Sequence, residues 1–258
     1  MSVALITGAS KGIGKAIAEE LAKRKTDVLL VARSVDLLEQ LAASLSAAYS
    51  VKADYLITDL TEPDAARKIF QWCIEKNHQV NMLINNAGYG LSGSFENYSL
   101  QDHLDLMKVN MNVAVELCHL FLPSLRLHPE SYILNMASHA AFQAVPGLNV
   151  YSASKAFLQS FSRGLRYELR KTNVSVTVIY PGSTDTDFAR RANVGPTAQK
   201  AARRFNMSAD KVARIAINAM FARKAETTAG IINKIGKFLV WLLPKKWSEK
   251  TAASIYDI

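Results

Sequence analysis

The sequence predicts an α/β fold, a doubly wound parallel sheet of the Rossmann-like kind in a single domain with helices on both faces. Short runs rich in Val, Ile and Leu alternate along the chain with longer stretches of helical periodicity. These runs are almost continuously apolar, as parallel strands covered on both faces are. With 258 residues and 49% hydrophobic content, the chain can bury one sizeable core.

Each predicted element follows from this alternation. The strands are expected at 2–7, 27–32, 52–57, 80–84, 131–137 and 174–180. The helices between them are expected at about 13–25, 35–48, 62–77, 101–127 and 150–171. Residues 183–207 contain a Gly-Pro pair, small residues and Arg pairs, which indicate a loop on the substrate side, and Ser208 is a suitable N-cap for a helix to Phe221. No repeat or linker divides the chain, so residues 1–258 are interpreted as one domain with a C-terminal extension at 230–258.

The composition narrows the class of protein. Cys73 and Cys118 lie in apolar stretches of helical pattern, which indicates buried thiols in a reducing, cytoplasmic compartment and neither a disulfide framework nor a metal site. The first strand pattern begins at residue 2, so no signal peptide is expected.

The net charge of +9 is concentrated in the C-terminal third. Residues 190–250 hold fourteen Lys and Arg against three acids, a balance of +11, which leaves −2 for the rest. A region of this kind is compatible with nucleic acid, a membrane surface, an anionic substrate or simple solvation. No DNA-binding motif is visible and aromatic residues do not interleave with the basic ones, so no nucleic-acid partner is expected.

A glycine-rich turn, Thr7-Gly8-Ala9-Ser10-Lys11-Gly12-Ile13-Gly14, links the first predicted strand to the first predicted helix. Glycines let a backbone approach a phosphate closely, and the helix N-terminus offers unpaired N–H groups and the positive end of the helix dipole. The pattern is related to the dinucleotide fingerprint but not identical to it. A purely structural turn is the alternative.

Two other motifs overlap this turn. Gly8 to Gly12 matches the G-x-S-x-G nucleophile elbow of hydrolases, but only seven residues precede it, too few for the strands that such a nucleophile requires. A P-loop is also excluded, because Ala9 replaces its first glycine and Ala16 replaces its Mg²⁺-binding Ser or Thr.

Tyr151 and Lys155 lie one helical turn apart, thirteen residues after Ser138. A Lys ammonium beside a Tyr phenol favours the phenolate and so lowers a pKa that starts near ~10. Such a tyrosine can exchange a proton with the oxygen of an alcohol or ketone, and Ser138 can hydrogen-bond that oxygen. Y-x-x-x-K alone is a common exposed helical pair, so the catalytic interpretation depends on the glycine-rich turn.

Taken together, the chain resembles the short-chain dehydrogenase/reductase family over about residues 1–190. The family patterns T-G-x-x-x-G-x-G, N-N-A-G and P-G-x-x-x-T match Thr7–Gly14, Asn85–Gly88 and Pro181–Thr186. Asn110, Ser138, Tyr151 and Lys155 stand at the spacing of the family's tetrad. Each match alone has a plain alternative, such as a turn or a helix cap, but the ordered series favours the family.

The resemblance implies hydride transfer between a nicotinamide and a carbonyl or alcohol. It implies that Tyr151 exchanges the proton, that Lys155 lowers the Tyr151 pKa and holds the nicotinamide ribose, and that Ser138 polarises the carbonyl. It also implies that Asn110 anchors a water linked to Lys155. The implied cofactor-binding residues are Gly8, Ser10, Lys11, Gly12, Ile13, Gly14, Arg33, Asp59, Leu60, Asn86, Ala87, Gly88, Asn110, Tyr151, Lys155, Pro181, Gly182, Thr184 and Thr186.

The end of the second strand favours NADPH (NADP⁺) as the cofactor. An NAD site of this kind would be expected to carry an acid there, but the chain reads Ala32-Arg33-Ser34. Arg33 and Lys11 suit a 2′-phosphate, because a guanidinium fork can bind it through two hydrogen bonds. NADPH in a reducing compartment favours the reductive direction. The alternative is that Arg33 is a solvated loop residue.

Residues 230–247 lie beyond the family motifs and combine large apolar side chains with lysines. The unbroken apolar run Phe238–Leu243 is far shorter than the ~20 residues that span a bilayer. We favour a helix that packs over the substrate cleft or at a subunit interface, and an amphipathic helix in peripheral contact with a membrane is the alternative. By analogy with family members, this tail favours a lipophilic carbonyl substrate such as an acyl, steroid or retinoid compound.

Family members commonly pair through the helices that carry Asn110 and Tyr151, so a homodimer or tetramer is expected. The apolar and small residues expected at that interface are Val113, Leu117, Leu120, Ala156, Phe157, Ser160 and Phe161. Two alternative functions stay open. One is a dinucleotide-binding sensor without turnover, against which the intact tetrad argues, and the other is a membrane- or nucleic-acid-associating module driven by the basic third.

Overall fold

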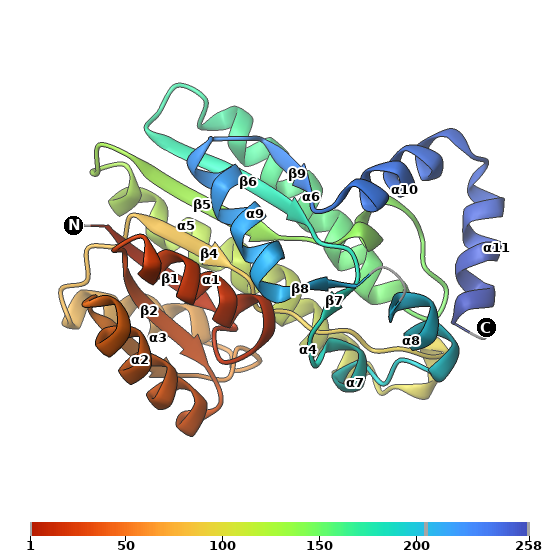
Figure 1. Cartoon of the computed structure of the whole chain (residues 1–258), viewed down its shortest axis with the longest axis horizontal. Coiled ribbons are helices and arrows are strands. Elements are labelled where there is room, and N and C mark those ends of the chain that lie inside the picture. Colours follow the sequence, from red (N-terminus) through yellow and green to blue (C-terminus); the bar gives the residue numbers. More distant parts are fainter. Residues whose placement is uncertain (1, 204–205, 257–258) are drawn as a thin grey trace.

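Seven parallel strands form the central sheet in the order β3-β2-β1-β4-β5-β6-β9 (Figure 1). The strands are β1 (Val3–Thr7), β2 (Asp27–Ala32), β3 (Ala53–Ile57), β4 (Met82–Asn85), β5 (Ser131–Met136), β6 (Val174–Tyr180) and β9 (Glu226–Thr228). The computed structural model describes residues 2–203 and 206–256. The predicted doubly wound α/β fold is confirmed, and β9 is the strand that the sequence did not predict, because Glu-Thr-Thr lacks an apolar run.

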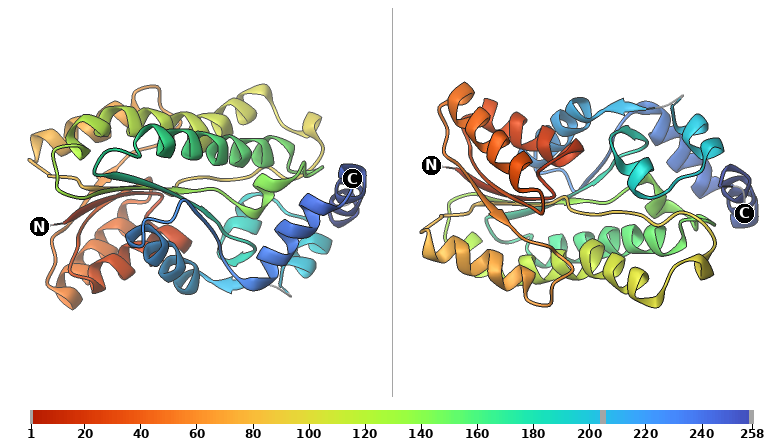
Figure 2. Two further views of the ribbon diagram at one scale, coloured as in Figure 1. Left: turned by 90° about the horizontal axis from the view of Figure 1, so that it is seen from above. Right: turned by 90° about the horizontal axis from the view of Figure 1, so that it is seen from below.

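Helices cover both faces of this sheet (Figure 2). One face carries α1 (Gly12–Lys23), α2 (Val35–Tyr49) and α9 (Ala209–Phe221), and the other carries α3 (Ala65–Glu75), α5 (Val113–Leu125) and α6 (Asn149–Glu168). Each helix buries one apolar stripe against the strands. Ser208 caps α9 as predicted, because its hydroxyl accepts a hydrogen bond from the N–H of Lys211.

The long helix predicted at 101–127 is interrupted. It consists of α4 (Leu100–Met107), a π-helical segment at Lys108–Asn112, and α5. Ser99 begins α4 with a capping box, in which it exchanges hydrogen bonds with Asp102. The π-helical segment carries Asn110, and such segments are frequent at functional sites. Apolar periodicity contains no signal for this change of helical pitch.

The two helices expected to form a subunit interface present fewer apolar residues to the surface than predicted. Val113 and Leu117 point into the core between α5 and the sheet, so their assignment to an interface was wrong. Leu120 and Phe161 are half-buried, whereas Ala156, Phe157 and Ser160 are exposed on α6.

The segment predicted as a loop at 183–207 contains short elements. They are β7 (Thr184–Asp185), α7 (Phe188–Arg191), α8 (Pro196–Arg203) and the start of β8 (Met207–Ser208), which pairs with β7. The 3₁₀ turns Phe95–Asn97 and His139–Phe142 complete the loops after β4 and β5. The chain ends in α10 (Ile231–Leu242) and α11 (Lys245–Ile255), and the last two residues of the predicted extension lie outside the described ones.

Cys73 and Cys118 are buried, as expected, and neither forms a disulfide bond. Burial raises the pKa of each thiol to about 12, so neither is reactive near neutral pH. Among residues 2–203 and 206–256, no helix is long and apolar enough to cross a bilayer, and no cluster of His, Cys, Asp and Glu could hold a metal ion.

Candidate active site

The glycine-rich turn lies at the carboxyl end of β1, where the strand order reverses between β1 and β4. Gly8 and Gly12 have φ values of 67° and 55°, a left-handed conformation that favours glycine. α1 begins at Gly12 without a side-chain cap, so the N–H groups of its first turn are available to an anion. A Cβ on Gly14 would overlap the carbonyl oxygen of Gly8. The turn therefore fits the phosphates of a dinucleotide.

Hydrogen bonds fix the segment after β4 to this turn. The Thr7 hydroxyl accepts bonds of 3.1 Å from the N–H groups of Asn86 and Ala87, and it donates to the carbonyl of Ile84. The side-chain amide of Asn86 donates to the carbonyl of Thr7 at 2.9 Å. Asn86 and Ala87 thus stand beside the turn as predicted, and Gly8 packs directly against Ala87.

Asn110 connects this segment to α6. Its Oδ1 accepts a hydrogen bond from the N–H of Tyr89 at 3.0 Å, and its Nδ2 donates to the Tyr89 carbonyl at 2.9 Å and to Ser154 Oγ at 3.0 Å. Gly88 lies so close that a Cβ on it would be 3.0 Å from Lys155 Nζ and 3.1 Å from Asn110 Oδ1. The structure therefore brings Gly88, Asn110 and Lys155 into one cluster.

Tyr151 and Lys155 lie on the buried face of α6, with exposed fractions of 9% and 4%. The Ser138 side chain, just after β5, lies near enough to the Tyr151 hydroxyl to lower its pKa. Lys155 Nζ lies 5.7 Å from the centroid of the Tyr151 ring and donates a 2.9 Å hydrogen bond to the carbonyl of Met136. Three members of the predicted tetrad thus converge at the carboxyl edge of the sheet, and Asn110 and Lys155 both lie beside Gly88.

The electrostatics of this pair differ from the expectation. Burial raises the pKa of Tyr151 to about 12, and the neighbouring Ser138 side chain acts in the opposite direction. Burial also lowers the pKa of Lys155 to about 8. The expected lowering of the Tyr151 pKa is not observed, because burial outweighs the other effects and the Lys155 amine is directed at a backbone carbonyl. The phenol is therefore protonated at neutral pH, the form that can donate a proton.

The two predicted phosphate-binding cations each lie beside a carboxylate. Arg33 forms a 3.3 Å ion pair with Asp59, and Lys11 forms a 3.2 Å ion pair with Asp187. All four side chains are at least one-third exposed, so these pairs contribute little to stability and can exchange partners. Leu60, next to Asp59, is buried. Each of the two cations is thus already paired with a carboxylate.

Sequence reasoning missed Arg191 of α7, which it treated only as part of a loop. Its guanidinium lies 4.9 Å from the centroid of the Tyr89 ring. Burial, and then the charge of Arg33, lowers the pKa of Arg191, so the two guanidinium groups are close enough to influence each other. No sequence motif marks this residue, because its position depends on how the segment after β6 folds back over the turn.

The segment after β6 also contacts the turn. The Pro181 carbonyl accepts a 2.8 Å hydrogen bond from the N–H of His139, and Thr184 Oγ1 donates to the Gly182 carbonyl at 3.1 Å. The Thr186 side chain lies against Gly12, at 3.0 Å from the position of a Cβ there. The partly exposed Ser10 and Ile13 complete the turn. The predicted cofactor residues of these three segments thus lie at the carboxyl ends of β1, β4 and β6.

Apolar side chains pack against Tyr151. Phe188 of α7 places its ring centroid 5.2 Å from that of Tyr151. Ala252 of α11 and Tyr256 belong to the same apolar cluster as Tyr151. The extreme C-terminal part of the described chain therefore borders the candidate site, and neither Phe188 nor Tyr256 could be identified from a motif.

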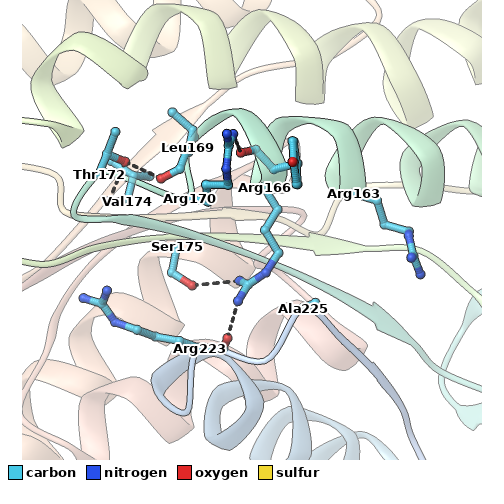
Figure 3. Close-up of a pocket in the computed structure, with 10 residues that line it drawn as sticks. Arg163, Arg166, Leu169, Arg170, Thr172, Val174, Ser175, Arg223 and Ala225 are labelled. Carbon is cyan, nitrogen blue, oxygen red and sulfur yellow. Dashed lines mark hydrogen bonds between the residues drawn. The ribbon is translucent and has the colours of Figure 1, made fainter.

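A separate hollow of about 300 Å³ lies at the opposite edge of the sheet, where α6 ends and β6 begins (Figure 3). Arg166 is directed at Ser175 and at the carbonyl of Arg223, with bonds of 3.2 and 2.7 Å. Arg163 pairs with Glu226, and Arg223 pairs with Glu130. These guanidinium groups point in different directions and are already bound, and the hollow contains none of the predicted site residues.

Comparisons with known proteins agree with this geometry. A family model described as short chain dehydrogenase matches residues 2–196. Hydroxysteroid dehydrogenase-like protein 1 of Gallus gallus is 36% identical over 69% of this chain and 54% of its own length, so the chain spans about half of that relative. A short-chain dehydrogenase from Sphingobium yanoikuyae in complex with NADPH is 28% identical, with a TM-score of 0.82 over 95% of this chain and 97% of that one. A short chain dehydrogenase/reductase from Burkholderia phymatum in complex with NAD is 25% identical, with a TM-score of 0.83 over 92% of each chain.

Proposed function

Because this chain belongs to the short-chain dehydrogenase/reductase family, we propose that it is an NADPH-dependent reductase of a ketone or aldehyde, or oxidises the corresponding alcohol in reverse. The observation that carries the proposal is the buried Tyr151, with the Ser138 side chain beside its hydroxyl and Lys155 one helical turn later. When bound, the nicotinamide supplies or accepts the hydride.

The chain's own residues handle the proton and the substrate oxygen. Tyr151 donates its proton to the carbonyl oxygen in reduction and takes it back in oxidation. Ser138 hydrogen-bonds the same oxygen and so stabilises the charge that develops on it. Lys155 holds the ribose hydroxyls, and Asn110 fixes the backbone beside Lys155 through its bonds to Tyr89 and Ser154.

We propose NADPH as the preferred cofactor because cations gather where a 2′-phosphate would lie. Arg33 follows Ala32 in place of an acid, Arg191 lies close enough to Arg33 to feel its charge, and Lys11 belongs to the glycine-rich turn. Asp59 would release Arg33 to the phosphate and remain near the adenine. The phosphates of the dinucleotide would lie on the first turn of α1.

The proposed substrate is lipophilic, such as an acyl, steroid or retinoid carbonyl. The support is the apolar cluster beside Tyr151, to which Leu148, Phe188 and Tyr256 contribute. In this proposal residues 183–207 form the substrate loop and residues 230–258 form an extension that borders the cleft. The protein would act in the cytoplasm as a homodimer or tetramer, and the exposed Phe157 on α6 would lie in the subunit interface.

A panel assay tests this proposal. NADPH absorbance is followed over ketones, aldehydes and 3-oxoacyl esters, with matched small and bulky members of each class. Turnover of at least one lipophilic carbonyl supports the proposal. Tight NADPH binding without turnover across the panel would instead favour a dinucleotide-binding sensor.

A further inference from the structure

A helix that packs on a protein core turns its apolar face inward, whereas α10 turns its apolar face outward. Ile231, Ile235, Phe238 and Leu242 follow the spacing i, i+4, i+7 and i+11, so they lie on one face. That face points away from the protein, with exposed fractions of 74%, 55%, 56% and 59%. α10 contains no buried residue. Figure 1 shows α10 at the edge of the molecule, between β9 and α11.

The inward face of α10 is the polar one. The Asn233 carbonyl accepts a 3.0 Å hydrogen bond from His139, and Gly236 packs against the His139 ring. Lys237 forms a 2.8 Å ion pair with Glu226 and lies over the rings of Phe142 and Tyr180. These contacts fix the rotation of the helix, so the apolar face cannot turn inward without breaking them.

The surroundings of this apolar face are basic and aromatic. Lys234 is exposed on α10, Lys245, Lys246 and Lys250 are exposed on the following helix α11, and none of them forms an ion pair within the part of the chain that the structure describes. No Asp or Glu occurs between Glu226 and Glu249. Trp241 of α10 and Trp247 of α11 are exposed to 77% and 63%. An apolar stripe edged by lysines and tryptophans matches the chemistry of a phospholipid interface.

We propose that this face of α10 docks in the plane of an anionic phospholipid surface. The apolar stripe would enter the boundary between headgroups and acyl chains, and the four lysines would contact anionic headgroups. A second copy of the chain fits less well, because it would bring the same uncompensated lysines together. His139, which follows Ser138, contacts the opposite, inward face of α10. The bilayer would therefore be separated from the candidate active site by the width of this helix. The proposal does not depend on the reaction.

Intrinsic fluorescence and flotation test this inference on the full chain. Trp72 is buried, so a blue shift of the emission on adding vesicles reports Trp241 and Trp247. The probe is vesicles that contain phosphatidylserine, with pure phosphatidylcholine vesicles as the comparison. We expect a blue shift and co-flotation with the anionic vesicles, weakening as salt is raised.

Two variants separate the apolar and the charged contributions. Ile235→Ser with Phe238→Ser should reduce vesicle binding at least tenfold. Lys245→Glu with Lys246→Glu should reduce binding to anionic vesicles by more than about fivefold for each lysine replaced. The same variant should bind neutral vesicles as the parent does. Leu127→Ser, an 85% exposed leucine before β5, is the matched control and should bind like the parent.

Absence of binding to anionic vesicles would overturn the proposal. So would equal loss of binding in the Leu127→Ser control. A dimer that dissociates in the Ile235→Ser and Phe238→Ser variant, without any vesicle binding by the parent, would assign the face to a second copy instead. Circular dichroism of each variant confirms that the fold is kept.

Discussion

Lys155 Nζ lies 5.7 Å from the centroid of the Tyr151 ring but donates its hydrogen bond to the carbonyl of Met136. Both side chains are buried, and burial favours the uncharged form of each, with a pKa of about 8 for Lys155 and about 12 for Tyr151. At neutral pH the Tyr151 phenol is therefore uncharged, whereas the Lys155 amine is still protonated. Any partner that stabilises the Lys155 ammonium will also favour the Tyr151 phenolate.

Replacing Lys155 by Met should stabilise the fold near neutral pH. The folded pKa of Lys155, about 8, lies below its ordinary value of 10.5, so between these values the unfolded chain binds more protons. The free energy of unfolding therefore rises between pH 8 and about 10.5. Below pH 8 Lys155 is charged in the folded protein, and the whole cost of burying that charge lowers the stability. Lys155→Met removes that penalty and one hydrogen bond, a net gain of about 1–3 kcal/mol at pH 7.

Thermal unfolding at pH 7 and pH 10 measures this effect. The difference between Lys155→Met and the parent should shrink at the higher pH. Lys224→Met, an exposed lysine after α9, should change little at either pH. A variant no more stable than the parent at pH 7 would contradict the burial of a titrating amine. Turnover and cofactor binding should both fall in Lys155→Met, because Lys155 serves both.

Arg33→Asp should shift the cofactor preference toward NADH. The substitution replaces an attraction for the 2′-phosphate with a repulsion, and a charged hydrogen bond of this kind contributes about 1.5–3 kcal/mol, or roughly ten- to a hundredfold in affinity. The ratio of NADPH to NADH dissociation constants measures it. Arg67→Asp on α3 makes the same charge change on an exposed helix away from the turn, and it should leave the ratio unaltered. Equal dissociation constants of the parent for NADPH and NADH would rule out the proposed preference for NADPH.

Phe157→Glu should dissociate the proposed dimer. Phe157 is 39% exposed on the outer face of α6, beside the exposed Ala156 and Ser160, so a buried charge there would oppose pairing. Sedimentation at micromolar concentration should show a dimer or tetramer for the parent and a monomer for the variant. Ile74→Glu, at an exposed position on α3, is the control. A monomeric parent would contradict the assembly.

Tyr256→Ala should discriminate between substrates by size. Tyr256 packs in the apolar cluster around Tyr151, so its removal takes contact surface from a bulky carbonyl and little from a small one. The ratio of kcat/KM for bulky over small substrates should fall about tenfold. Ser254→Ala, exposed on α11, should leave the ratio unchanged. A parallel loss for both substrates would make Tyr256 a structural residue only.

The sequence predicted those parts of the molecule whose signal is local. Six strands and the helices between them follow from apolar runs, and the glycines at 8, 12 and 14 follow from the close backbone approach that they permit. The π-helical segment that holds Asn110 was missed because it changes pitch and not polarity. β9 was missed because its sequence contains no apolar run, and pairing with β6 holds it as a strand.

The remaining differences come from tertiary contacts. Arg191, Phe188 and Tyr256 reach the candidate site only through the folding of the segments after β6 and β9, which no spacing rule describes. The Tyr151 pKa was misjudged for the same reason, since the degree of burial is a property of the fold. The apolar face of α10 points outward because polar contacts to His139 and Glu226 set the rotation of the helix, which the sequence pattern does not reveal.

The central claim is that Tyr151 is the proton donor, and the Tyr151→Phe variant tests it most directly. Phe keeps the ring and its packing against Phe188 but removes the hydroxyl beside Ser138. Tyr167→Phe, an exposed tyrosine on the same helix, is the matched control. With a carbonyl substrate from the panel, turnover by Tyr151→Phe should fall about 10²–10⁴-fold while its dissociation constant for NADPH stays nearly unchanged. Turnover within a few-fold of the parent, with Tyr167→Phe equally active, would show that another group supplies the proton.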